Sequence, residues 1–265
     1  MLIDPKTAKV RGVAKLTKKD ARSSTGLFLL EGPQGLKEAL DRPKLIVELY
    51  ATEDAVDRYP DLFERAESAR IQAQLVSEPV LKALTDTTTP QGVVAVCEQI
   101  DVNLKNIIDA KPQLVALLAN IRDPGNAGTV LRAADAAGAD AVIFSANSVD
   151  VYNPKVVRST TGSLFHLPFA VDIEIEDAIS ALKSAGLQVF AANGGGQQIP
   201  DLPAETLAKP TVWVFGNEAW GFEQSTLDLV DQEVAVPIYG AAESLNLATA
   251  ASICLYASAF AQNRQ

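Results

Sequence analysis

Short apolar runs alternate with amphipathic segments along the first hundred residues, which predicts alternating strands and helices. The apolar and β-branched runs lie at 28–32, 45–50, 75–76 and 93–96, and the helical patterns lie at 33–40, 59–69 and 79–84. Residues 85–92 are rich in Thr, Pro and Gly and predict a loop. The pattern therefore predicts a small α/β domain over residues 1–97.

The alternation becomes stronger after a polar, weakly periodic stretch at 98–112, which predicts a linker. Residues 114–119 form a continuous apolar run, as expected for a parallel strand covered on both faces. Further strands are predicted at 141–144, 165–169, 188–192 and 211–215, with helices near 129–137 and 249–260. Residues 113–265 therefore predict an open parallel α/β sheet, in which ligands bind at the carboxyl ends of strands.

Composition narrows the possible chemistry. The 265-residue chain is 48% hydrophobic, so it can bury a sizeable core. It contains one histidine, His166, and two cysteines, Cys97 and Cys254, far apart in sequence. These residues cannot assemble a zinc site or a disulfide framework, so a metal-free protein of a reducing compartment is predicted. His166 lies in an apolar run and is predicted to be a structural residue of a strand.

Membrane attachment is not indicated by the sequence. The N-terminus is charged, and no segment reaches the roughly 18 consecutive apolar residues of a membrane span. We therefore expect a cytoplasmic protein without a membrane partner.

Charge is distributed unevenly along the chain. The formal net charge is -10, yet residues 1–22 hold seven basic and two acidic side chains. A clustered basic segment can bind phosphates whatever the total charge, because binding releases condensed counterions. The alternative is a solvated basic helix with no ligand.

Three loops at predicted strand ends carry the candidate chemistry. The first, residues 120–132, follows a buried strand and opens a helix, and it contains Asn126 and Arg132. Asn126 could instead cap the helix, and Arg132 could pair with a surface acid. The second loop, residues 214–222, brings Gly216 and Glu218 to another strand end, with aromatic residues behind them.

The third loop, residues 236–248, leads into a helix of small apolar residues that should be buried or lie at a subunit contact. Ser244 and Asn246 lie at the start of that helix. The glycine patterns of dinucleotide-binding and P-loop proteins are absent from the sequence. Gly194, Gly195 and Gly196 predict only a flexible turn.

Taken together, the loops resemble a known family. The patterns N-x-x-x-x-x-R, F-G-N-E-x-x-G-F and S-L-N-L-A-T-A-A occur in order within residues 106–265. They resemble the three signature motifs of the SpoU (TrmH-like) RNA 2′-O-ribose methyltransferases of the SPOUT superfamily. Residues 26–32, GLFLLEG, are similar to a signature of the substrate-binding domain fused to some members, which is similar in fold to ribosomal protein L30e.

The resemblance implies a fold and an activity. The expected fold is α/β, with a SPOUT-type open parallel sheet, a C-terminal trefoil knot and a smaller N-terminal L30e-like domain. The expected activity is S-adenosylmethionine-dependent methylation of a ribose 2′-OH in RNA. The expected substrate is 23S ribosomal RNA, and the expected assembly is a homodimer. A transfer RNA substrate, or an RNA-binding paralogue without catalysis, remains the alternative.

The resemblance also assigns residues. The implied catalytic residues are Arg132, Asn126, Glu218, Ser244 and Asn246. The implied cofactor-binding residues are Ala192, Asn193, Gly216, Val236, Ile238 and Leu245. The expected RNA contacts are Lys15, Lys18, Lys19, Arg22 and, in a loop at 153–162, Arg158. A guanidinium is almost always protonated, so Arg132 is expected to hold a phosphate and polarise the 2′-OH.

Overall fold

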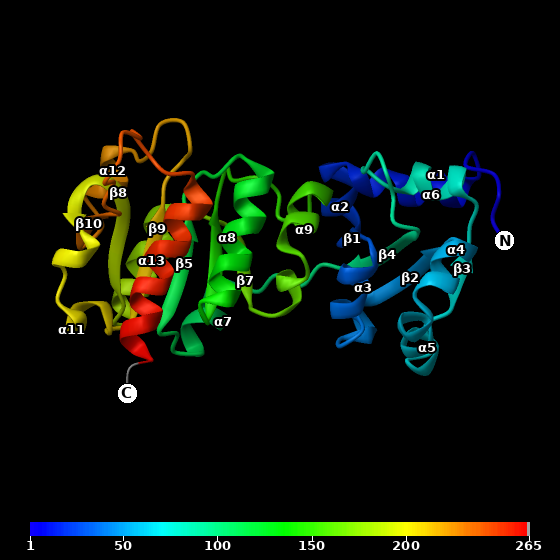
Figure 1. Ribbon diagram of the computed structural model, residues 1–265, viewed down its shortest axis with the longest axis horizontal. Coiled ribbons are helices and arrows are strands. Elements are labelled where there is room, and N and C mark those ends of the chain that lie inside the picture. The colour runs from blue at the N-terminus through cyan, green and yellow to red at the C-terminus, as the bar shows by residue number, and fades with distance from the viewer. Residues whose placement is uncertain (264–265) are drawn as a thin grey trace. The chain divides into compact units, whose positions relative to one another are not determined.

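The computed structural model describes residues 1–263 and divides the chain into two compact units. The first unit comprises Met1–Ile100 together with Asp150–Phe165. The second comprises Asp101–Val149 and the described residues from His166 onward. The segment 150–165, expected within the second domain, thus groups with the first hundred residues. Each unit has its own sheet (Figure 1).

The first unit is built on a four-stranded mixed sheet in the order β1-β4-β2-β3. Its strands are β1 (Leu27–Glu31), β2 (Ile46–Ala51), β3 (Ala73–Leu75) and β4 (Val93–Glu98). Its helices are α1 (Ala8–Ala14), α2 (Lys19–Thr25), α3 (Pro33–Ala39), α4 (Glu53–Arg58), α5 (Pro60–Ser68), α6 (Glu78–Leu84) and α9 (Pro154–Thr160). Val10 of α1 and Leu81 of α6 pack in one buried cluster with Leu29, Tyr50 and Val94 of the strands. The strands and helices predicted in this region are present, but α1, α2 and α4 were not among the predicted helices.

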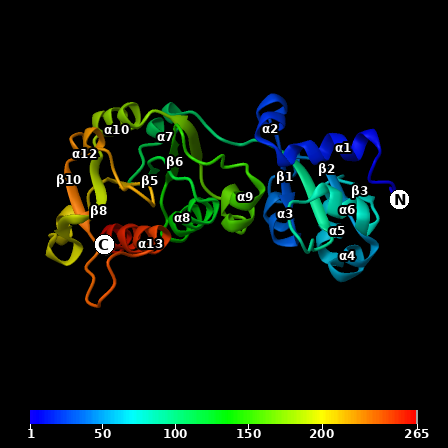
Figure 2. The ribbon, with the colours of Figure 1, turned by 90° about the horizontal axis from the view of Figure 1, so that it is seen from above.

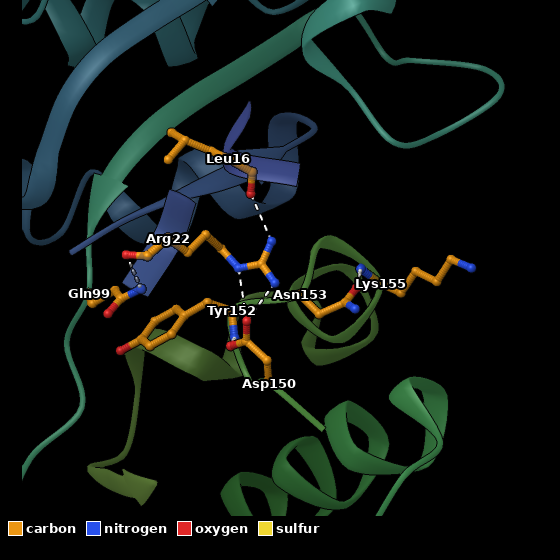
Figure 3. A network of polar contacts seen from close by, with 7 residues as sticks. All are labelled: Leu16, Arg22, Gln99, Asp150, Tyr152, Asn153 and Lys155. Atoms are coloured by element: carbon orange, nitrogen blue, oxygen red, sulfur yellow. Dashed lines mark hydrogen bonds and ion pairs between the residues drawn. The ribbon is translucent and has the colours of Figure 1, made fainter. Parts of the chain in front are cut away.

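A buried ion pair fixes the segment 150–165 within this unit (Figure 3). The Arg22 side chain is 3% exposed, and its Nε donates to Asp150 Oδ2 at 2.9 Å. Its Nη1 donates to the Leu16 carbonyl at 2.8 Å. Nearby, the backbone N–H of Ile100 donates to the Tyr152 hydroxyl at 2.7 Å. Arg22 was expected to contact RNA, but its guanidinium is used inside the fold and is not part of the exposed basic surface.

The second unit is built on a six-stranded sheet in the order β10-β8-β9-β5-β6-β7, in which every pair is parallel. The strands are β5 (Leu114–Leu118), β6 (Ala141–Ser145), β7 (Phe169–Ile173), β8 (Gln188–Gln198), β9 (Thr211–Phe215) and β10 (Gln232–Ala235). The helices are α7 (Leu104–Asp109), α8 (Pro124–Ala136), α10 (Ile175–Ser184), α11 (Ala204–Leu207), α12 (Gln224–Leu227) and α13 (Leu247–Gln262). Figure 2 shows α8 and α13 on one face of the sheet and α7 and α10 on the other. The predicted open parallel sheet is confirmed.

Several local predictions differ from the structure. The expected linker contains α7, whose Ile107 is 2% exposed and belongs to the core of the second unit. The expected loop at 153–162 contains α9, which Asn153 caps by accepting from the Lys155 N–H. The strand expected at 165–169 begins only at Phe169, because the chain first makes a short 3₁₀ helix over Ser163–Phe165.

His166 therefore does not lie in a strand. It is exposed, and its Nδ1 lies 2.7 Å from Oδ2 of Asp135 on α8. The apolar residues around it suggested a buried strand, but they flank a turn instead.

The glycines at 194–196 do not form the expected turn, since β8 continues through them. β8 pairs with β10, and the register shifts between Glu233 and Val234. A Cβ on Gly196 would lie 2.3 Å from the carbonyl carbon of Glu233, so only glycine permits this approach of the two backbones.

Cys97 and Cys254 are both free and buried. Burial raises the pKa of each thiol to about 12, so both stay protonated at neutral pH. No helix within residues 1–263 is long and apolar enough to cross a membrane. In the same part of the chain, no three His, Cys, Asp or Glu side chains are grouped to hold a metal ion.

The Arg22–Asp150 pair should be important for the stability of the first unit. Removing one member of a buried ion pair strands the other charge, which typically costs about 3 kcal/mol or more. We expect Arg22→Ala to lower the free energy of unfolding by about this amount, as measured by urea unfolding. Lys19→Ala, which changes an exposed neighbour, should leave unfolding unchanged. Equal unfolding curves for the two variants would contradict a stabilising role for the pair.

Candidate active site

Parallel pairing brings three strand ends to one level of the sheet. Leu118 of β5 is in register with Phe215 of β9, and Phe215 is in register with Ala192 of β8. The residues that follow these positions must therefore leave the same edge. Those residues open the first two candidate loops and the glycine-containing half of β8.

A cavity of about 460 Å³ lies at this edge. It is lined from four segments: the start of α8, the middle of β8, the loop after β9, and the stretch from β10 into α13. The lining residues are Asn126, Ala192, Asn193, Gly194, Gly216, Asn217, Glu218, Gly221, Phe222, Val234, Val236, Ile238, Glu243, Ser244, Leu245, Asn246, Leu247 and Ala250. All six residues expected to bind the cofactor line it, as do four of the five expected catalytic residues.

The helix that follows the first loop is capped by a residue other than Asn126. Asp123 Oδ1 accepts from the Asn126 backbone N–H at 2.7 Å, so Asp123 is the N-cap of α8. Asn126 lies inside the first turn of the helix. The alternative in which Asn126 serves as the cap is therefore wrong, and its side chain is available for other bonds.

A chain of side-chain hydrogen bonds connects the three loops. The Asn126 amide donates from Nδ2 to Glu218 Oε1 at 3.2 Å. The Asn246 Nδ2 in turn donates to Asn126 Oδ1 at 2.9 Å. Since each amide uses both ends, the bonds fix which way the Asn126 side chain faces. We refer to Asn126, Glu218 and Asn246, in sequence order, as the Asn–Glu–Asn chain; its bonds run from Asn246 through Asn126 to Glu218.

Both ends of the Asn–Glu–Asn chain are attached to backbone. Glu218 also accepts from the backbone N–H groups of Arg122 and Asp123, at 3.4 Å and 3.3 Å. A carboxylate near the first turn of α8 is favoured by the helix dipole. Asn246 is the N-cap of α13, and its Oδ1 accepts from the N–H groups of Ala248 and Thr249. The start of each helix thereby holds one end of the chain.

Arg132 lies outside this arrangement. It is exposed on α8, does not line the cavity and makes no hydrogen bond or ion pair with the described residues. The predicted alternative, in which Arg132 pairs with a surface acid, is therefore not seen among the described residues. At about 100° per residue, the six positions from Asn126 to Arg132 turn the helix by about 600°, so the two side chains leave α8 about 120° apart.

The expected RNA contacts in the first unit differ in exposure. Lys15, Lys18 and Lys19 are exposed, whereas Arg22 is buried. Arg158 is 30% exposed and pairs with Glu31 at 3.0 Å and, less closely, with Asp86. Burial raises the pKa of the Glu31 carboxyl, against the lowering effects of the Asp86 N–H and of Arg158.

Sequence reasoning missed several residues of the cavity. Asn217 is 5% exposed, and its Nδ2 donates to the Asn120 carbonyl at 2.6 Å, which ties the second loop to the first. Gly194 also lines the cavity, and nothing lies within 4 Å of a Cβ built on it. Its position two residues after Ala192, at the common strand edge, was the available signal. Asn217 is the fixed asparagine of the motif F-G-N-E-x-x-G-F, and that motif was the available signal for it.

Two parts of the chain match known domains. Residues 113–256 match the SpoU rRNA Methylase family. Residues 29–102 match a domain described as RNA 2′-O ribose methyltransferase substrate binding.

Proteins of comparable length are similar to nearly the whole chain. The chain is 36% identical over 255 residues to the 23S rRNA (guanosine(2553)-2′-O)-methyltransferase RlmP of Bacillus subtilis (strain 168), with 95% of this chain and 96% of the relative covered. It is 31% identical over 249 residues to the 23S rRNA (uridine(2479)-2′-O)-methyltransferase of Streptomyces viridochromogenes, with 92% and 86% covered. The crystal structure of an AdoMet-bound rRNA methyltransferase from Sinorhizobium meliloti superposes with a TM-score of 0.84 at 30% identity, covering 97% of this chain and 96% of that one.

The cavity fits the expected cofactor, S-adenosylmethionine. Its volume lies in the range of about 300–1,000 Å³ typical of small-molecule sites. Apolar side chains such as Ile238 and Leu245 suit an adenine ring, while Asn126, Glu218 and Ser244 offer polar groups at the same wall. The glycines leave backbone groups accessible to a ligand. The expectation of a methyltransferase that uses S-adenosylmethionine is confirmed, and the chain belongs to the SpoU rRNA methylase family.

Proposed function

We propose that the protein transfers a methyl group from S-adenosylmethionine to the 2′-OH of a ribose in 23S ribosomal RNA. The observation that carries the proposal is the single cavity lined by the second and third motifs and by Asn126 of the first, joined through the Asn–Glu–Asn chain. The names of the Bacillus and Streptomyces relatives support the ribosomal substrate.

The cofactor site is formed largely by backbone and apolar groups. Gly216 would allow close approach, Val236, Ile238 and Leu245 would cover the adenine, and Ala192 and Asn193 would complete the wall from β8. When bound there, S-adenosylmethionine supplies an electrophilic methyl group on a positively charged sulfur. Asn193 is already oriented, because its Nδ2 donates to Glu233 Oε2 at 2.6 Å.

The polar residues position the nucleophile. Glu218 holds the Asn126 amide, and Asn246 holds it from the other side, so Asn126 presents one fixed face to the ribose. Ser244 adds a hydroxyl at the cavity wall. Alignment of the reacting groups can lower a barrier by several kcal/mol, about 7–11 in the best cases.

Arg132 acts on the ribose as a cation. Its guanidinium holds a phosphate beside the target ribose and polarises the 2′-OH. With S-adenosylmethionine bound, the ribose oxygen would take the methyl group as its bond to sulfur breaks, and the hydroxyl proton would pass to water.

The same site needs a second chain. Arg132 does not reach its own cavity, so we propose that it serves the cavity of a partner subunit in a homodimer. The exposed side of α13 offers an apolar surface for that dimer: Ile253 is 40% exposed, Phe260 is 60% exposed, and the Tyr256 ring lies 5.4 Å from that of Phe260.

The N-terminal unit binds the RNA. We assign substrate binding to residues 1–97, the connection to 98–112 and catalysis to 113–265. Lys15, Lys18 and Lys19 are exposed and carry no ion pair among the described residues, so they are available to phosphates. Arg158 contributes only its exposed part, because Glu31 and Asp86 hold its guanidinium.

A trefoil knot at the C-terminus also belongs to this proposal. The strand order supports it: β10 pairs at the outer edge with β8, yet the following α13 packs against α8, β9 and β5, which lie further into the sheet. After β10 the chain therefore returns over one face of the sheet toward β9 and β5, a path that is compatible with a knot. A crystal structure traced through residues 188–262 would test this path.

Arg132→Ala should strongly reduce methyl transfer without changing the affinity for S-adenosylmethionine. We expect a loss of about 100-fold or more in kcat/KM on unmodified 23S rRNA, the scale of one lost transition-state donor. The dissociation constant for S-adenosylmethionine, measured by calorimetry, should stay within twofold. Arg58→Ala, at an exposed arginine of the first unit, is the control.

Normal transfer by Arg132→Ala would refute its role. If the wild-type protein binds RNA but does not bind S-adenosylmethionine and does not methylate RNA, it is the non-catalytic paralogue. If transfer RNA were methylated and 23S rRNA were not, the substrate assignment would be wrong.

Charge reversal at Lys15, Lys18 and Lys19 should weaken RNA binding on the order of tenfold and flatten its salt dependence. Three lost phosphate contacts reduce the slope of log K against log salt by about 2–3. Filter binding at several salt concentrations measures this slope. The control reverses three other exposed lysines, Lys44, Lys111 and Lys209. Equal slopes for both triple variants would exclude a special role for residues 15–19.

Ile253→Glu with Phe260→Glu should convert the dimer into a monomer, because two charges would be buried at the contact. Light scattering should give twice the 28.1 kDa chain mass for the wild type and once that mass for the variant. Val47→Glu, at another exposed apolar residue, should remain dimeric.

The shared site can be tested by mixing two inactive variants, Arg132→Ala and Glu218→Ala. The mixture should regain part of the activity, because one chain supplies an intact cavity and the other supplies Arg132. A wild type that is monomeric and active would exclude the shared site.

A further inference from the structure

Trp220 is a large exposed aromatic residue at the edge of the cavity. Its side chain is 52% exposed, whereas Trp213 is fully buried with its Nε1 bonded to Ser258. It lies between Glu218 and Gly221, which both line the cavity. An exposed indole beside a ligand site indicates an interaction surface, since the ring would be better packed inside a protein.

The turn that carries Trp220 is firmly held. Asn217 and Gly221 exchange two backbone hydrogen bonds, each of 2.9 Å. The Asn217 Oδ1 accepts from the Ala219 N–H, while its Nδ2 reaches the Asn120 carbonyl. Gly216 packs against the same turn, where a Cβ would lie 2.7 Å from the Gly221 oxygen. The indole is therefore presented by a braced turn.

Arg122 lies over the indole. Its Cζ is 5.5 Å from the ring centroid, and its side chain makes no ion pair within residues 1–263. Its backbone N–H donates to Glu218 Oε2, the carboxylate that also holds Asn126. The guanidinium and the indole thus come from the first and second loops and are attached to the Asn–Glu–Asn chain.

We propose that Arg122 and Trp220 form a stacking platform for a base of the RNA substrate, next to the target ribose. This inference rests on the proposed function. For a ribose to enter the cavity, its nucleotide must leave the RNA stack, and an exposed base then needs a new partner. Stacking on an aromatic side chain contributes about 1–3 kcal/mol per base, and single-stranded RNA is commonly recognised on aromatic and guanidinium planes.

A base is a better occupant than an apolar protein segment. The Arg122 guanidinium at the platform complements the phosphates on either side of a base. A hydrophobic peptide would offer the guanidinium no anionic group of its own. The Glu218 carboxylate beside it already accepts three hydrogen bonds from the protein, which reduces its repulsion of phosphate.

Substitutions at Trp220 separate stacking from simple packing. With unmodified 23S rRNA as substrate, we expect Trp220→Ala to raise KM by about 10-fold, the lower half of the stacking range. Trp220→Phe should stay within about threefold of wild type, while Trp220→Leu, apolar but without a π face, should behave like alanine. The dissociation constant for S-adenosylmethionine and the urea-unfolding midpoint should not change. Arg122→Ala should raise KM less than Trp220→Ala.

Fluorescence gives a readout that does not depend on turnover. Acrylamide should quench the exposed Trp220 but not the buried Trp213, and saturating 23S rRNA should protect Trp220. Unprotected Trp220, or a Leu variant as effective as the Phe variant, would overturn the platform. Wild-type activity separates the two hypotheses: no methylation of RNA by the wild type refutes the proposed function, whereas normal wild-type activity with an unchanged KM in Trp220→Ala refutes only the platform.

Discussion

Parallel strand pairing is the constraint on which the candidate site depends. Because β5, β9 and β8 are in register at Leu118, Phe215 and Ala192, their carboxyl ends open at one edge. Asn126 and Glu218, which lie 92 positions apart in sequence, then meet without any long side chain having to reach. The Asn–Glu–Asn chain closes this edge with two hydrogen bonds, 3.2 Å and 2.9 Å long.

The acidic character of the protein is compatible with an RNA substrate because the charges are used locally. Glu218 is surrounded by donors from the α8 loop, and Asp150 is neutralised by Arg22 inside the first unit. The exposed cations at 15–19 and at Arg122 are not held in such pairs. Whether a phosphate can bind at a surface therefore depends on which local charges are paired. The net charge of -10 is a poor guide to that.

The sequence predicted the architecture better than the contacts. A parallel strand that is covered on both faces gives a nearly continuous apolar run in the sequence. Strands such as those at 114–119 and 211–215 could therefore be predicted. His166 was misplaced because a turn can be as apolar as a strand. Arg22 was misjudged because its partner, Asp150, lies 128 residues away and nothing local marks the pair. The second motif includes Asn217, but nothing local indicates its bond to the Asn120 carbonyl, 97 positions away.

The six-residue spacing between Asn126 and Arg132 determines how far apart their side chains point, which a match to the motif does not reveal. Asn126 and Arg132 are conspicuous as a pair in one motif, which invites the picture of both side chains in one pocket. A helix separates them by about 120°, and the structure puts Asn126 at the cavity wall and Arg132 outside it. Rotating α8 to bring Arg132 inward would break the bonds of Asn126 to Glu218 and Asn246 and the Asp123 cap. Under the shared site proposed above, α8 stays fixed and Arg132 acts on a neighbouring chain. One subunit would then hold the cofactor and orient the ribose, and its partner would supply the cation.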